Sequence, residues 1–132
     1  GTGPYYSSGN DLAELAEVPD DPVAKAKSSA AMLENFVDAF IRHPKPLVAA
    51  VNGPAIGIAA TTLALCDIVW ASHTATFNTP FSALGQSPEA CSSLLFPQLM
   101  GAAKANEVLI GGRKLTAAEA CDRNLVAEVF EA

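Results

Sequence analysis

The sequence predicts an α/β domain in which short buried strands alternate with helices. Residues 47–51 form a short apolar run between turn residues, and residues 67–71 form a second such segment. Runs of this kind are typical of strands that are buried on both faces. The composition agrees, because 50% hydrophobic and only 17% charged residues suit a buried interior. A length of 132 residues gives room for one domain with a substantial core.

Residues 1–7 are predicted to be the last part of a strand. Residues 8–21 should form a loop with a short helical turn around residues 12–16. A long helix should begin at Pro22, because Asp21 is a good capping residue and Pro favours the first helical position. It should end near His43, before two prolines. We expect the apolar residues that recur every three or four positions to face the core: Val23, Ala26, Ala30, Leu33, Val37, Phe40 and Ile41.

The remaining elements follow in order. Residues 56–65 are predicted to be helical between the two apolar strands, and residues 92–100 and 102–110 to form two further helices. Thr116 and Glu119 have the spacing of a capping box, which predicts a short helix there. Asn124 should end that helix before a strand at residues 126–130, because Asn tolerates the left-handed conformation.

The charge pattern argues against nucleic acid and against an acidic membrane surface as partners. The net charge is −6, and the eight Lys and Arg residues are scattered. No apolar run approaches the length of about 18 residues that a membrane-spanning helix needs. The three cysteines, Cys66, Cys91 and Cys121, lack metal-ligand spacing, so we expect buried free thiols and no metal site.

Two segments resemble fingerprints of the crotonase, or enoyl-CoA hydratase/isomerase, superfamily. Residues 6–12 read Tyr-Ser-Ser-Gly-Asn-Asp-Leu, and residues 52–58 read Asn-Gly-Pro-Ala-Ile-Gly-Ile. Residues 63–71 and 75–80 also look like the segments that come next in this family. The resemblance implies a crotonase-type spiral of ββα units. Because members of the family are longer, we expect residues 1–132 to be the central part of a single crotonase-like domain that lacks the opening strands and closing helices.

The resemblance also implies a site. The backbone N–H groups of Ser8 and Ile58 would form an oxyanion hole, the second of them at a helix start, where N–H groups have no intrahelical acceptor. Glu89 would be the general base and acid. Taken alone, Glu89 could instead be an acid that caps the following helix. The implied substrate-binding residues are Ser7, Ser8, Gly9, Asn10, Asp11, Leu12, Gly57 and Phe81.

Two departures from the family pattern indicate which reaction is run. Hydratases of this superfamily use two glutamates, and this chain has Thr61 and Phe81 at the matching positions. The remaining acid near the expected pocket, Glu89, lies at a position that resembles the single base of the Δ3,Δ2-enoyl-CoA isomerases of the peroxisomal/mitochondrial type. The expected activity moves a double bond from 3-enoyl-CoA to trans-2-enoyl-CoA through a dienolate, in unsaturated fatty acid β-oxidation. The coenzyme A thioester is then the substrate, and no cofactor is expected.

The isomerase resemblance implies a homotrimer, or a dimer of trimers, in the peroxisome or mitochondrion. A second family offers an alternative. Residues 53–57, 66–71, 85–88 and 111–116 also resemble the C-terminal domain of chromodomain Y-like corepressors. That resemblance implies a CoA-binding or protein-interaction domain without turnover, in the nucleus. The intact segment 8–11 and the retained Glu89 favour the enzyme.

Overall fold

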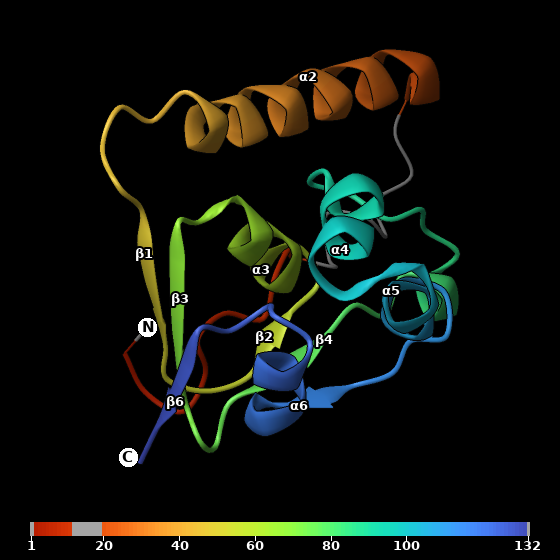
Figure 1. The fold of residues 1–132 in the computed structure, drawn as a ribbon. Helices are drawn as coiled ribbons and strands as arrows, with labels where there is room; N and C mark the ends of the chain where they lie inside the picture. The colour runs from red at the N-terminus through yellow and green to blue at the C-terminus, as the bar shows by residue number, and fades with distance from the viewer. Residues whose placement is uncertain (1, 12–19, 132) are drawn as a thin grey trace.

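The described residues form two small sheets with helices on one side (Figure 1). The structure is a computed structural model that describes residues 2–11 and 20–131. One sheet has the order β1–β3–β6, all parallel, with bounds Val48–Val51, Ile68–Ser72 and Glu128–Phe130. In the other sheet β2 pairs parallel with β4 and β4 pairs antiparallel with β5; their bounds are Ala55–Ile56, Thr76–Asn78 and Leu115–Thr116. The α/β class is therefore confirmed.

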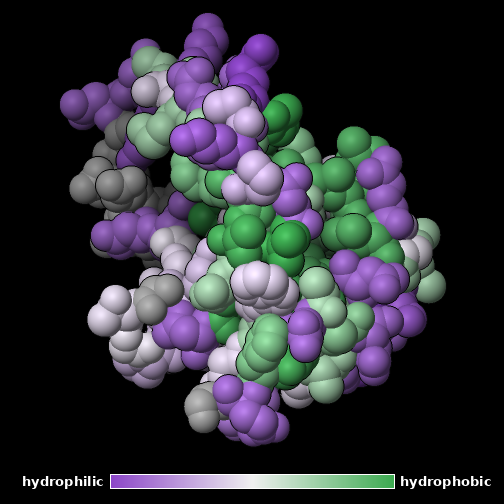
Figure 2. Space-filling model, turned by 60° about the vertical axis from the view of Figure 1, so that its left-hand side comes forward, coloured by the Kyte–Doolittle hydropathy of each residue, from purple (hydrophilic) through white to green (hydrophobic). Residues whose placement is uncertain are grey.

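Within residues 2–11 and 20–131, only one face of the sheet β1–β3–β6 is covered, so the prediction of strands buried on both faces was wrong. Burial alternates along the strands: Ala49 and Val69 are buried, whereas Val48 is 50% and Trp70 40% exposed. Phe130 of β6 packs edge-on against Trp70 with ring centres 6.2 Å apart. Figure 2, which brings this side of the molecule forward, shows hydrophobic side chains gathered on it. The apolar runs thus predicted where the strands lie, but they did not predict which faces of the sheet are covered.

The long helix is present as α2 (Pro22–Ile41). The carboxylate of Asp21 accepts hydrogen bonds from the N–H groups of Val23 and Ala24, both at 3.0 Å, as the capping pattern predicts. Its apolar stripe is not core throughout, which corrects the prediction. Val37 is buried, but Val23, Ala26, Ala30 and Ile41 are exposed. The reason is that α2 lies across one end of the molecule and meets the described chain mainly at the 3₁₀ helix η1 (Thr62–Leu65).

The helix predicted for residues 56–65 begins two residues later. Ile56 belongs to β2, and its N–H donates to the carbonyl of Ser7 at 3.0 Å. Helix α3 (Ile58–Thr61) starts after Gly57 and continues into η1. Strand pairing at Ile56 therefore outcompetes the helix there. Of the strand predicted at residues 1–7, the described part shows only a bridge from Ser7 to Ala55, and the turn predicted at 12–16 lies outside the described residues.

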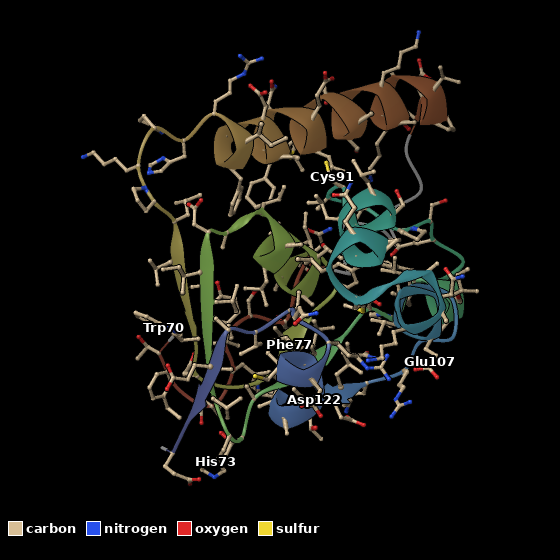
Figure 3. The ribbon with its side chains drawn as sticks, viewed as in Figure 1. Trp70, His73, Phe77, Cys91, Glu107 and Asp122 are labelled. Carbon is tan, nitrogen blue, oxygen red and sulfur yellow. The ribbon has the colours of Figure 1, made fainter. Side chains whose placement is uncertain are left out.

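The C-terminal half follows the predictions closely. Helices α4 (Ser92–Met100) and α5 (Ala102–Leu109) are joined at Gly101, and α6 (Ala117–Asp122) opens with the capping box. Asn124 has φ +62°, as its left-handed role requires, and β6 starts at Glu128. Figure 3 shows Phe77 in the interior of the molecule. It is one of the largest fully buried side chains, with Phe81, Phe96, Leu63 and Leu115. No helix in residues 2–11 and 20–131 is long and apolar enough to span a membrane.

Candidate active site

The N-terminal segment lies directly against the turn that follows β2. The N–H groups of Tyr6 and Ser7 donate to the carbonyl of Pro54 at 3.1 and 3.3 Å. Gly9 has φ +87°, and a Cβ atom placed on it would lie only 2.5 Å from the carbonyl oxygen of Ile56. Any larger residue would push the two segments apart. The glycine of the first fingerprint is therefore needed for close approach to the second.

Two backbone donors are left without acceptors at this junction. The N–H of Gly57 is used by the carbonyl of Asn78 at 2.8 Å, but Ile58 is the first residue of α3 and has no intrahelical acceptor. Within the described residues, neither the N–H of Ser8 nor that of Ile58 donates to a protein acceptor. Both residues line a small cavity of about 60 Å³. One wall of this cavity is thus suited to binding an oxyanion.

Glu89 lies in the wall of the same cavity. Its side chain is partly buried, and this burial raises the pKa of the carboxyl group above its ordinary value. No described residue donates a hydrogen bond to the carboxylate. The capping alternative does not hold, because α4 has Cys91 at its N-cap and no side-chain capping bond. A weakly solvated carboxylate of this kind is suited to taking up a proton.

The structure brings most of the predicted site residues together. The cavity is lined by Ser8, Gly9, Asn10, Gly57, Ile58, Phe81 and Glu89. Ser7 and Asp11 do not line it, although the hydroxyl of Ser7 accepts a hydrogen bond from the N–H of Gly9 at 3.3 Å and so supports the loop. Leu12 lies outside the described residues. The placement of these groups does not test the roles that we predict for them.

Four lining residues were not among the predicted site residues: Ile56, Pro80, Leu84 and Gln86. Three of them lie in the turn after β4, which closes on itself through a hydrogen bond from the N–H of Gln86 to the carbonyl of Phe81 at 2.8 Å. The apolar surroundings of this turn are visible in the sequence. Which of its side chains reach the cavity depends on how the turn folds back, and no local pattern gives that.

Thr61 and Phe81, the two positions that the resemblance matches to the hydratase glutamates, are both buried. Thr61 is fully buried, and its hydroxyl donates to the carbonyls of Gly57 (3.4 Å) and Ile58 (3.2 Å), so it is already used within the helix. Phe81 is 2% exposed. Among the described residues, Glu89 is the only carboxylate that lines the cavity. The described residues also contain no group of three or more His, Cys, Asp or Glu side chains that could hold a metal ion.

The three cysteines are free thiols in the structure, but not all are buried. Cys66 and Cys121 are partly buried, and burial, with a smaller effect of the Asp67 carboxylate, raises the pKa of the Cys66 thiol. Cys91 is exposed at the start of α4 (Figure 3), which corrects the expectation of buried thiols. Cys91 is not among the residues that line the cavity.

Size alone does not mark the site. A larger and shallower hollow of about 280 Å³ lies on the open face of the sheet β1–β3–β6. Its lining includes Ala50, Trp70 and Phe130, and none of the predicted site residues. The smaller cavity, by contrast, combines two unpaired donors with one carboxylate. We therefore take the smaller cavity as the candidate active site.

Comparison with known proteins identifies the family of this chain. The family model for enoyl-CoA hydratase/isomerase matches residues 1–132. Human enoyl-CoA delta isomerase 2 is 60% identical over 131 residues, which are 98% of this chain and 33% of that protein. Mouse enoyl-CoA delta isomerase 3, peroxisomal, is 57% identical over 98% of this chain and 41% of that protein. Human chromodomain Y-like protein is 50% identical over 88% of this chain and 19% of its own length.

Solved structures share the fold. The enoyl-CoA hydratase/isomerase of Pseudoalteromonas atlantica superposes with a TM-score of 0.83 at 41% identity, over 98% of this chain and 49% of that one. The enoyl-CoA hydratase of a Polaromonas species gives a TM-score of 0.88 at 32% identity, over 99% and 51%. The chain thus spans about half of these structures and less than half of its curated relatives. Its fold is of the crotonase type, and the chain belongs to the enoyl-CoA hydratase/isomerase family.

Proposed function

We propose that this chain carries the catalytic centre of a Δ3,Δ2-enoyl-CoA isomerase that acts in unsaturated fatty acid β-oxidation. The observation that carries the proposal concerns the described residues: the carboxylate of Glu89 is the only one that lines the small cavity, together with Ser8 and Ile58, whose N–H groups have no acceptor there. Two donors and one base are sufficient to move a proton next to a thioester carbonyl. The names of the 57–60% identical relatives support the same activity.

In the proposed mechanism, ionised Glu89 removes a proton from C2 of a 3-enoyl-CoA. The electrons of the broken C–H bond form a dienolate, whose oxygen accepts hydrogen bonds from the N–H groups of Ser8 and Ile58. The protonated Glu89 then returns the proton at C4, which leaves the double bond between C2 and C3. The raised pKa of Glu89 brings its basicity nearer to that of the reacting carbon acid, because burial disfavours the carboxylate.

Water addition is the competing reaction, and the surroundings disfavour it. A hydratase needs a second group to orient and activate water, and the cavity contains no other described carboxylate. Thr61 cannot substitute, since its hydroxyl is buried and bonded to main-chain carbonyls. Phe81 brings a large apolar ring where an acid would be required. A single base that gives and takes one proton fits isomerisation better.

The test replaces Glu89 with Gln, which keeps the size and removes the base. We expect kcat for conversion of 3-enoyl-CoA to 2-enoyl-CoA to fall by the ~10²–10⁴ that is typical of a lost general base. KM should hardly change, because the two amide donors remain. Turnover is followed by the absorbance of the conjugated thioester. Glu34→Gln, an exposed position on α2, is the matched control. Near-normal isomerisation by Glu89→Gln would place the base elsewhere.

The similarity to chromodomain Y-like protein supports a second candidate, a domain that binds acyl-CoA without turnover. Calorimetric titration with a saturated acyl-CoA, combined with the isomerase assay, separates the two. Binding without turnover by the unaltered protein would favour this second candidate and a nuclear location. Turnover would favour the isomerase, for which we propose the peroxisome or mitochondrion, in keeping with the name of the mouse relative. The trimer or dimer of trimers stays a prediction.

A further inference from the structure

The chain turns sharply between Glu89 and the start of α4. Ala90 has φ +50° and Cys91 has φ +59°, so two consecutive residues other than glycine adopt the left-handed conformation. The N–H of Ser92 donates to the carbonyl of Glu89 at 3.0 Å and closes the turn. Positive φ at both central positions is the type I′ geometry, which is usually built from Gly, Asn or Asp. Ala and Cys are unfavourable choices for it.

Several contacts hold this unfavourable turn in place. The hydroxyl of Ser92 donates a second hydrogen bond to the carbonyl of Glu89 at 2.6 Å, and Ser92 is fully buried. Ala90 is 4% exposed and is anchored by burial. Pro88 precedes Glu89 and fixes its own φ angle. Cys91, in contrast, has an exposed side chain, and only its main chain is anchored: its carbonyl accepts hydrogen bonds from the N–H groups of Leu94 (3.0 Å) and Leu95 (2.9 Å) at the start of α4. Left-handed backbone at residues other than glycine is often found at functional sites.

The turn determines where the Glu89 side chain points. Because no described residue donates a hydrogen bond to the carboxylate, the direction of the Glu89 side chain into the cavity depends on the main chain around it and on the packing of the cavity wall. We infer that the turn from Glu89 to Ser92 is a positioning device, in which the left-handed Ala90 and Cys91, closed by Ser92, aim the Glu89 carboxylate at the substrate. Cys91 and Ser92 are then positioning residues. This inference rests on the proposed role of Glu89 as the base.

The first test is Cys91→Gly, in the protein that shows isomerase turnover. Glycine adopts the left-handed conformation freely, so the variant should be at least as stable to urea as the unaltered protein. Its looser turn should lower kcat by about ten- to a hundredfold, since small misplacements of a catalytic group cost this much, while KM changes little. Cys91→Asn, which also favours left-handed backbone but restricts it, should keep kcat near its original value.

The matched control is Asn124→Gly. Asn124 is also left-handed, with φ +62°, but it follows α6 and does not line the cavity. Its replacement should leave kcat unchanged. A purely structural role of the turn at Cys91 would make the two glycine variants behave alike. Equal kcat in Cys91→Gly, Asn124→Gly and the unaltered protein would overturn the inference.

A second readout does not depend on turnover. The pKa of the Glu89 carboxyl, measured from its carbon chemical shift against pH, is expected to be raised in the unaltered protein. Cys91→Gly and Ser92→Ala should bring it back toward the ordinary value, because the carboxylate can then swing out to water. The described cavity lining contains no other ionisable side chain to obscure the titration. An unchanged pKa in the folded variants would contradict the positioning role.

The two proposals can fail separately. If Glu89→Gln abolishes turnover but Cys91→Gly and Ser92→Ala keep both kcat and the Glu89 pKa, the positioning device is wrong and the isomerase proposal stands. If Glu89→Gln remains active, the proposed base is wrong. In that case the titration alone decides whether the turn holds the side chain in the cavity.

Discussion

Glu89 and Glu119 show how differently one residue type is treated in two regions of this molecule. The Glu119 carboxylate accepts hydrogen bonds from the N–H of Thr116 (2.9 Å), from the Arg113 guanidinium (2.7 Å) and from the Thr116 hydroxyl (3.1 Å), which together lower its pKa to about 2. Glu89 has no such donors, and burial raises its pKa. The Glu119 carboxylate at the helix end thus accepts several hydrogen bonds, whereas the Glu89 carboxylate in the cavity accepts none from the described residues.

The same contrast applies to the donors. At the start of α6 the capping box uses the N–H of Glu119, which donates to the Thr116 hydroxyl at 3.2 Å. At the start of α3 no side chain caps the helix, and Ile58, whose N–H has no acceptor among the described residues, lines the cavity. Helix ends are normally satisfied locally when they serve only the fold. Within the described residues, a helix start and an acid without hydrogen-bond partners thus line the same cavity, as the proposed reaction requires.

Beyond Glu89→Gln, the largest effect on turnover should come from removing the donor at Ile58. Proline fits the first helical position and lacks the N–H, so Ile58→Pro should leave α3 intact. Loss of one oxyanion donor typically lowers kcat by about 10²–10³. Ile58→Ala keeps the N–H and is the control, with a much smaller loss. Circular dichroism verifies folding and the isomerase assay measures kcat. Equal activity of the two variants would show that this N–H does not contact the substrate oxygen.

A smaller effect, on stability rather than activity, is expected at Glu119. Its folded pKa lies below the ordinary value of 4.5, so its contribution to the free energy of unfolding is present above that pH and is lost as pH falls toward about 2. Glu119→Gln should therefore unfold at lower urea concentration than the unaltered protein at pH 7. The difference should shrink on acidification. Activity of the folded variant should not change, and Glu34→Gln should show neither effect.

The smallest effect should have the opposite sign. The folded pKa of Glu89 is raised, so the folded state binds the proton more tightly and its stability falls as pH rises through the ordinary value toward the folded value. Glu89→Gln carries no charge into the cavity, and we expect it to be more stable than the unaltered protein at pH 7. The two proteins should converge below pH ~4, where Glu89 is protonated. A less stable Glu89→Gln at neutral pH would mean that the carboxylate has a partner in solution.

Much of this arrangement could be predicted from the sequence, because its signals are local. Helix starts such as Asp21 and the capping box at Thr116 depend on side chains within three positions, and both are confirmed. Asn tolerates the left-handed backbone conformation, and Asn124 adopts it. The two fingerprint segments approach closely because residue 9 is a glycine. The residue type alone therefore indicates the close approach. The predicted roles of the site residues stay predictions.

The rest depended on contacts that no local pattern contains. Trp70 and the apolar stripe of α2 are exposed because no described element packs over them. Their apolar sequence alone could not show this. Ile56 belongs to a strand because it pairs with Asn78 and its N–H donates to the carbonyl of Ser7, and both partners are distant from it in the chain. Ala90 and Cys91 give no warning of left-handed backbone, since neither residue prefers it. The least predictable part of the molecule is thus the turn that carries the candidate base.

Trp70 has a practical consequence for measurements on this protein. It is the single tryptophan of the chain, it is 40% exposed on the open sheet face, and it stacks edge-on against Phe130. Figure 3 shows it at β3, and it does not line the candidate active site. Emission from the indole will therefore report on the contact between β3 and β6. A spectroscopic signal for substrate binding will require a label placed near the cavity, because the intrinsic fluorophore faces another surface.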